Sequence, residues 1–168
     1  NPAAKNAFIK AADIAKNAGR KIALSLSDSF CVNRHRESFV KLVGNHIDIL
    51  FANDDEIKAL YKTSSLNTAI EELKKTCDLA AITLGKKGSI LISSGKEINI
   101  DPFIFGKAID TTGAGDLYAG GFLKGLADGL KPEISARIGS ICAGHIVTQL
   151  GSRSNTDLLN LISSHLEP

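Results

Sequence analysis

The sequence predicts an α/β fold, with a mostly parallel sheet and helices on both of its faces. Short apolar runs bounded by polar residues alternate with longer segments of helical periodicity over the first half of the chain. This alternation is typical of βαβ units, in which the crossover helices cover the sheet. The 168 residues contain no repeat, low-complexity tract or linker, and this length suits one domain with a sizeable core. We therefore expect a single domain over residues 1–168.

The first half of the chain alternates helices with apolar strands. Short, apolar, bounded runs predict buried strands at residues 22–26, 47–51 and 79–84. Helical periodicity predicts helices at residues 3–18, 34–43, 54–61 and 67–76. Gly19 is expected to stop the first of these helices, and Asn67 is expected to cap the start of the last.

The second half of the chain begins with a predicted hairpin and continues with helices. Residues 89–92 and 97–100 flank a polar turn that contains Gly95, which predicts an antiparallel pair of strands. Periodicity predicts the remaining helices at residues 114–128, 133–149 and 156–165. In the first of these helices the glycines predict close packing against the sheet. Its expected buried stripe comprises Ala119, Phe122, Leu123, Leu126 and Leu130.

Composition excludes several classes of function. The net charge of +2 gives no electrostatic footprint for nucleic acid or an anionic membrane. The apolar runs are shorter than a bilayer requires, so we expect no membrane partner and a cytoplasmic protein. The chain begins Asn1-Pro2 and contains no methionine, so we expect that it was processed or cut from a longer protein.

Polar segments follow the predicted strands. Asp28, Asn53–Glu56, Thr83–Gly85 and Asp110–Asp116 all lie at or beyond the expected end of a strand. In open α/β sheets, ligands bind outside the carboxyl ends of the strands. We therefore expect these segments to form one site.

The string Asp110-Thr-Thr-Gly-Ala-Gly-Asp116 carries the most specific chemistry. Gly113 and Gly115 permit a close backbone approach, and the helix that starts here offers unpaired amides and a positive dipole end. Together these features predict an anion hole suited to phosphate. Asp116 has two interpretations at this point: a cap or dipole partner of the helix, or a base that accepts the proton of an attacking hydroxyl.

Two other phosphate-binding motifs do not fit. A P-loop requires GxxxxGK[ST], and this string is absent from the sequence. The dinucleotide fingerprint GxGxxG could use Gly113 and Gly115, but it requires a glycine where Tyr118 stands.

The seven-residue string and the small-residue helix after it resemble the signature of PfkB (ribokinase-like) kinases. The resemblance implies a three-layer α/β/α fold and an ATP-dependent phosphotransferase. It implies that Gly113, Ala114 and Gly115 form the anion hole and that Asp116 is the catalytic base. It also implies that Asp110 and Thr112 help to bind a monovalent cation such as K⁺.

Other segments are similar to the family's motifs in the same order. Asn53 and Glu56 match its N-x-x-E motif, which arranges Mg²⁺ and phosphate, although an acidic helix start explains the same residues. Three residues match the family's nucleotide loop. These residues are Thr83, Gly85 and Gly88. The same segment can also be interpreted as an ordinary glycine-containing connection between two strands. The segment from Ser140 to Gly151 resembles the lining of the adenine pocket.

The resemblance covers only the carboxy-terminal, ATP-binding half of a family member, so residues 1–168 are expected to lack the acceptor site and the lid. Residues 25–36 look most like bacterial adenosine-kinase-like members. The expected partners are ATP and a small acceptor, adenosine or a sugar, and a homodimer is compatible with an exposed apolar edge. A fructokinase or ribokinase activity, a non-catalytic nucleotide-binding module and a non-functional remnant remain open alternatives. The chain alone is expected to be inactive.

Overall fold

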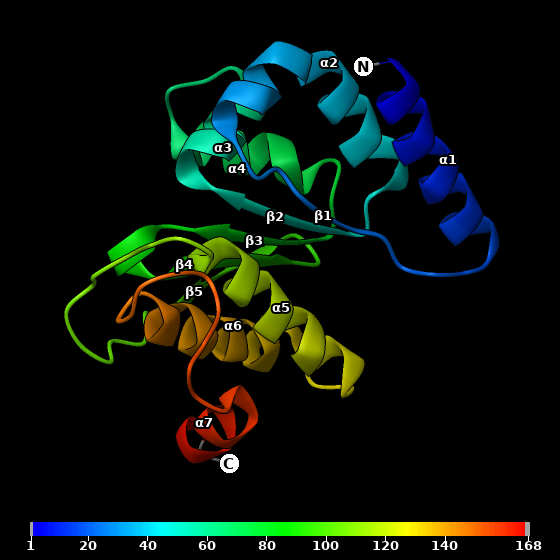
Figure 1. The fold of residues 1–168 in the computed structure, drawn as a ribbon. Coiled ribbons are helices and arrows are strands. Elements are labelled where there is room, and N and C mark those ends of the chain that lie inside the picture. The colour runs from blue at the N-terminus through cyan, green and yellow to red at the C-terminus, as the bar shows by residue number, and fades with distance from the viewer. Residues whose placement is uncertain (1, 167–168) are drawn as a thin grey trace. The chain divides into compact units, whose positions relative to one another are not determined.

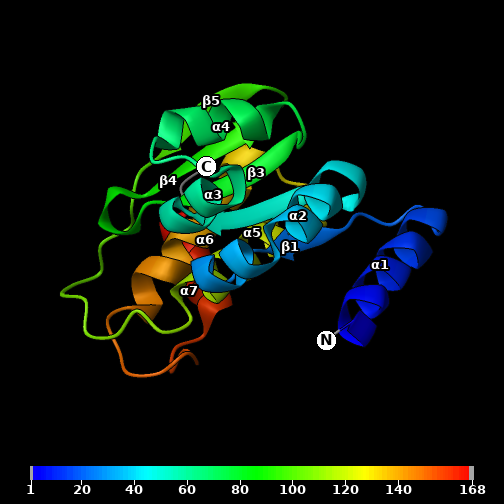
Figure 2. The same ribbon diagram turned by 90° about the horizontal axis from the view of Figure 1, so that it is seen from above.

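The computed structural model describes residues 2–166. Figures 1 and 2 show the chain in two perpendicular views, with its elements labelled. The first half contains α1 (Pro2–Asn17), β1 (Ala23–Ser25), α2 (Ser29–His46), β2 (Ile49–Asn53), α3 (Asp54–Tyr61), α4 (Leu66–Lys74) and β3 (Leu79–Thr83). The second half contains the 3₁₀ turn η1 (Gly85–Lys87), β4 (Ser89–Ser93), β5 (Lys96–Ile100), α5 (Ala114–Ala127), α6 (Pro132–Ile146) and α7 (Leu158–His165). None of these helices combines the length and the apolar character needed to cross a membrane.

The strands form one sheet in the order β1-β2-β3-β4-β5. Strand β1 runs parallel to β2, with Ala23 opposite Ile49, and β4 pairs antiparallel with β5, with Ser89 opposite Ile100. The predicted α/β class, the mostly parallel sheet and the hairpin are confirmed. The chain divides into two compact units within β3, after Ala80.

Helix α1 ends as the sequence predicts. Gly19 adopts a left-handed φ of 65°, its amide donates to Lys16 O, and the amide of Arg20 donates to Ala15 O. This hydrogen-bond pair is a Schellman motif, which glycine favours because it has no Cβ to clash. The helix lies beside α2 (Figure 1). Polar contacts join the two helices, for example the hydrogen bond that Lys5 Nζ donates to Ser38 Oγ.

Two predicted helix starts in the first unit are wrong. Helix α2 begins at Ser29 rather than near residue 34, because the Asp28 carboxylate accepts hydrogen bonds from the amides of Phe30 and Cys31. Helix α4 is capped by Ser65 and not by Asn67, since the Ser65 hydroxyl accepts from the Thr68 amide. In both cases a short polar side chain satisfies amides that the first turn leaves unpaired.

Two glycines of α5, Gly121 and Gly125, pack against α6 and not against the sheet. A Cβ on Gly121 would lie 2.9 Å from Cys142 Sγ, and one on Gly125 would lie 2.7 Å from Ser135 Oγ. Both partners belong to α6, and on that helix Gly139 approaches the backbone of α5 equally closely. These glycines therefore set a close distance between the two helices.

This packing changes which face of α5 is buried. The predicted stripe is correct for Phe122, which is fully buried, but Leu123 and Leu130 are 36% and 39% exposed. The buried positions are Tyr118, Gly121, Phe122 and Gly125.

Candidate active site

The amino end of α5 presents free backbone amides. Its N-cap is Gly113, with a left-handed φ of 79° and no side chain that could cap the helix. A Cβ at this position would stand 2.6 Å from Cβ of Ser152, so both conformation and space require glycine. The amides of Gly115 and Asp116 find no acceptor among the described residues. Such amides, at the positive end of the helix dipole, are suited to bind an anion.

Asp116 lies in the first turn of this helix and is exposed. Its carboxylate makes no hydrogen bond or ion pair with any other residue in the described part of the chain. It therefore does not cap the helix, although it can still interact with the helix dipole. Gly115, next to it, is also exposed, and no atom lies within 4 Å of the place where its Cβ would be. The space beside Gly115 can thus admit a ligand.

Asp110 holds the loop that leads into α5. One carboxylate oxygen accepts from the Thr112 amide at 2.8 Å, and the other accepts from the Gly151 amide at 2.9 Å. The hydrogen bonds from Thr112 and Gly151 lower the pKa of Asp110 below its ordinary value. The amide of Ile109 also donates to Val147 O, so the connection after β5 lies along the turn after α6 (Figures 1 and 2). The structure thus brings Asp110 and Thr112, which are predicted to help bind a cation, together with Gly151, which is predicted to line the adenine pocket.

The segment predicted to be a nucleotide loop forms a compact turn between β3 and β4. The amide of Leu84 donates to Gly88 O, and that of Gly88 donates back to Gly85 O. Gly88 has a φ of 86°, and its Cβ would lie 2.1 Å from Ile100 O, so it must be glycine for packing reasons alone. Gly85 has a φ of 59° and open space around it. Contact of a nucleotide with Thr83, Gly85 or Gly88 stays a prediction.

The hydroxyl of Ser140 is hydrogen-bonded to the backbone of the segment after β5. Its buried hydroxyl donates to Asp101 O at 2.9 Å and accepts from the Phe103 amide at 3.2 Å. It therefore fastens α6 to the segment after β5. Any effect of Ser140 on a nucleotide would act through this segment, and its predicted place in an adenine pocket stays a prediction.

In the first unit, Asn53 and Glu56 are locked to each other. Glu56 accepts from the backbone and side-chain nitrogens of Asn53 at 2.9 and 2.8 Å, while Asn53 Oδ1 accepts from the Glu56 amide. This reciprocal arrangement is a capping box at the start of α3. Burial raises the pKa of Glu56, and the nearby Asp28 and Asp55 raise it further. A cation near this carboxylate would oppose these effects.

Asn53 and Glu56 can supply only part of the ligands that a Mg²⁺ ion needs. Each Glu56 oxygen accepts one hydrogen bond from Asn53 and keeps lone pairs for a water or an ion. Within residues 2–166, no group of three or more His, Cys, Asp or Glu side chains forms a metal cage. Mg²⁺ commonly takes one or two carboxylates, several waters and the substrate's phosphates. Glu56 could therefore contribute to a Mg²⁺ site that the nucleotide completes.

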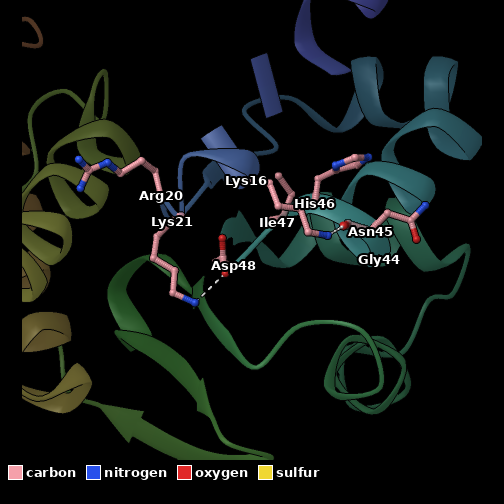
Figure 3. A pocket seen from close by; sticks show the side chains of 9 residues that line it. Lys16, Arg20, Lys21, Gly44, Asn45, His46, Ile47 and Asp48 are labelled. Atoms are coloured by element: carbon pink, nitrogen blue, oxygen red, sulfur yellow. Dashed lines mark hydrogen bonds and ion pairs between the residues drawn. The ribbon is translucent and has the colours of Figure 1, made fainter. Parts of the chain in front are cut away.

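A surface pocket of about 310 Å³ lies elsewhere in the first unit (Figure 3). It is lined by Lys16, Gly19–Lys21 and Gly44–Asp48, which lie before the amino ends of β1 and β2. Asn53 lies at the opposite, carboxyl end of β2. Two cations of the pocket are engaged within the chain, because Lys21 binds Asp48 and Lys16 donates to Asn45 O. This pocket is therefore not part of the candidate site.

One buried hydrogen bond was not predicted from the sequence. The hydroxyls of Tyr118 and Ser89 lie 2.8 Å apart, and the two residues are only 3% and 2% exposed. The signal was present in the sequence, because a tyrosine on the buried face of a helix needs a partner for its hydroxyl. The identity of that partner, 29 positions away, could not be read from any local pattern.

The model of the pfkB family carbohydrate kinases matches residues 2–158. The chain belongs to the PfkB family. Among solved structures, an adenosine kinase from Sinorhizobium meliloti superposes with a TM-score of 0.93 at 40% identity, covering 97% of this chain and 50% of that one. A protein described as a probable sugar kinase, from Rhizobium etli CFN 42, gives a TM-score of 0.92 at 35% identity, covering 96% of this chain and 49% of that one. These likenesses confirm the predicted ribokinase-like, three-layer α/β/α fold.

A curated relative is named for nucleosides in general. A nucleoside kinase from Methanocaldococcus jannaschii is 31% identical over 132 residues, which cover 79% of this chain and 43% of the relative. PfkB kinases similar to this chain are thus named for adenosine, for nucleosides or for sugars. The chain spans about half the length of these relatives.

Proposed function

We propose that residues 1–168 are the carboxy-terminal, ATP-binding half of a PfkB kinase domain. The natural protein would transfer the γ-phosphoryl group of ATP to a hydroxyl of a nucleoside or a sugar, with adenosine as the favoured acceptor. The observation that carries this proposal is the amino end of α5, where two unpaired amides lie beside open space and a carboxylate without a partner. The preference for adenosine rests on the similarity to the S. meliloti adenosine kinase.

Each part of this site has a distinct task in phosphoryl transfer, which requires positioning, charge stabilisation and a base. The backbone of Gly113, Ala114 and Gly115, with the free amides of Gly115 and Asp116, would hold the phosphate oxygens. The Asp116 carboxylate would accept the proton of the attacking hydroxyl. Mg²⁺ would neutralise charge on the phosphates, and Glu56 of the first unit is a candidate ligand for this ion. The ionised carboxylate of Asp110, with Thr112, would support the anion hole and bind a K⁺-like ion beside it.

The base is tested by Asp116→Asn in the natural protein, assayed with ATP, Mg²⁺, K⁺ and adenosine by following AMP. We expect kcat to fall about a hundredfold or more, the range typical of a general base, with ATP affinity nearly intact. Thermal stability should change little, because the carboxylate has no hydrogen-bond or ion-pair partner within the described residues and interacts only with the helix dipole. A fall in melting temperature without a loss of kcat would show that Asp116 serves the helix and not the reaction.

A sugar acceptor is the second candidate, supported by the likeness to the R. etli protein. A panel of adenosine, ribose and fructose distinguishes the candidates by kcat/KM. The 168-residue chain alone should turn over none of them at a useful rate, because holding the acceptor in line supplies roughly 7–11 kcal/mol of such a barrier. Robust turnover by the chain alone would show that it contains an acceptor site.

A further inference from the structure

Tyr118 connects two segments of the candidate site. It lies on α5, two residues after Asp116, and its hydroxyl meets that of Ser89 at 2.8 Å. Ser89 is the first residue of β4 and directly follows Gly88, the last residue of the turn predicted to contact the nucleotide. One buried hydrogen bond therefore joins the helix that presents the anion hole to the end of this turn.

The ring of Tyr118 is held on several sides. It stacks on Phe122 with the ring centroids 6.4 Å apart. A Cβ on Gly139 of α6 would lie 2.7 Å from Tyr118 O and 3.2 Å from the Tyr118 ring, so α6 packs directly against this residue. Burial raises the pKa of the Tyr118 phenol to about 12, so the hydroxyl stays protonated at neutral pH. A rigid ring with a fixed hydroxyl can define the position of Ser89.

The turn is also fixed at its other side. Gly88 packs against the backbone of Ile100 and Pro102, at the end of β5. Between these two supports the turn closes on itself through the hydrogen bond from Leu84 to Gly88. Loss of the support from Tyr118 would leave the packing of Gly88 in place but would free the turn to move relative to α5.

We infer that Tyr118 is a positioning residue, which sets the turn Leu84–Gly88 relative to the amino end of α5 so that one nucleotide can contact both. This inference rests on the proposed function. Phosphates would bind the amides of α5, and the turn would meet another part of the same ligand. A ligand that spans both segments depends on their separation, whereas a ligand that binds α5 alone does not. Preorganisation of this kind raises affinity because less ordering remains to be done on binding.

The test compares two ligands, magnesium ATP and magnesium tripolyphosphate, by calorimetry on the natural protein. Tyr118→Phe removes the hydroxyl and keeps the ring. We expect the Kd for ATP to rise about fivefold, the effect of losing one buried hydrogen bond, while the Kd for tripolyphosphate stays within about twofold. The matched control is Tyr61→Phe, which removes the chain's other tyrosine hydroxyl, paired with Thr76 at 3.0 Å in the first unit. The control should change neither Kd.

A second variant keeps the test informative if Tyr118→Phe leaves the Ser89 hydroxyl unpaired and the protein unfolds. In Tyr118→Phe/Ser89→Ala both hydroxyls are absent, which can be nearly neutral for stability. The double variant should lose as much ATP affinity as Tyr118→Phe alone or Ser89→Ala alone. The losses of the two single variants should not add. Unchanged ATP affinity in a folded variant would refute the inference, and so would equal weakening of ATP and tripolyphosphate. A natural wild-type protein that binds neither ligand would refute the proposed function itself.

Discussion

Replacing Gly115 by valine should separate ligand binding from folding at the anion hole. The added side chain would project into open space, since no atom lies within 4 Å of the Cβ position and φ is not left-handed. The free energy of unfolding should therefore change by no more than about 0.5 kcal/mol. A bound phosphate, however, would lose contact with the amides of Gly115 and Asp116. Each such hydrogen bond to a charged group contributes about 1.5–3 kcal/mol, so the Kd for magnesium ATP should rise at least about tenfold.

The matched control for this variant is Gly120→Val, on the same helix. Gly120 is exposed, and its Cβ would also meet nothing within 4 Å. Both variants introduce the same side chain and the same helix propensity, but only Gly115 borders the proposed phosphate site. Calorimetry with magnesium ATP and thermal melts on both proteins give the comparison. Equal ATP affinity in the two variants would place the phosphate site elsewhere and refute the reasoning.

Three further predictions concern the loop, the helix pair and the surface. Because its pKa is lowered on folding, Asp110 stabilises the fold above the ordinary Asp pKa, and this stability is lost as pH falls through the lowered value. The melting temperatures of wild type and Asp110→Asn should therefore converge as pH falls below the ordinary pKa of an aspartate, and a constant difference would contradict the assignment. Gly125→Ala should destabilise the chain by about 1–3 kcal/mol in denaturant unfolding, because the methyl would overlap Ser135, whereas Gly120→Ala should not destabilise it. Phe8 and Ile14 are 63% and 59% exposed on α1, so light scattering should detect association that rises with concentration and weakens in Phe8→Lys/Ile14→Lys. A monodisperse monomer at every concentration would contradict this prediction.

Local patterns were enough to predict most of the elements. The alternation of apolar strands with helices, the β4–β5 hairpin and the Gly19 stop depend on residues close in sequence, and the structure confirms them. The start of α2 was missed because its periodic apolar pattern becomes clear only after the first turn. The Asp28 cap was nevertheless visible as an aspartate at the end of a strand. A search for capping residues ahead of the first apolar position would have placed this boundary correctly.

Packing between distant segments could not be predicted in the same way. The glycines of α5 do allow close approach, but the sequence does not tell whether the partner is a sheet or a helix. The apolar stripe failed at Leu123 for the same reason, since this residue is exposed on α5, and it failed at Leu130 because α5 ends at Ala127. Similarly, the anion-hole string was recognisable because it is local, whereas the contact of Tyr118 with Ser89 depends on how α5 meets β4.

Amide exchange at the amino end of α5 tests the proposed phosphate site most directly. Exchange rates of the Gly115 and Asp116 amides are measured by NMR on the 168-residue chain, with and without saturating magnesium ATP. Neither amide has an acceptor within the described residues, so both should exchange rapidly in the free protein. If the phosphates bind here, ATP should slow both amides strongly, while the amide of Gly95 in the turn between β4 and β5, which also has no acceptor among the described residues, should be unaffected. Saturation with ATP that leaves the Gly115 and Asp116 amides exchanging as fast as before would show that the nucleotide binds elsewhere.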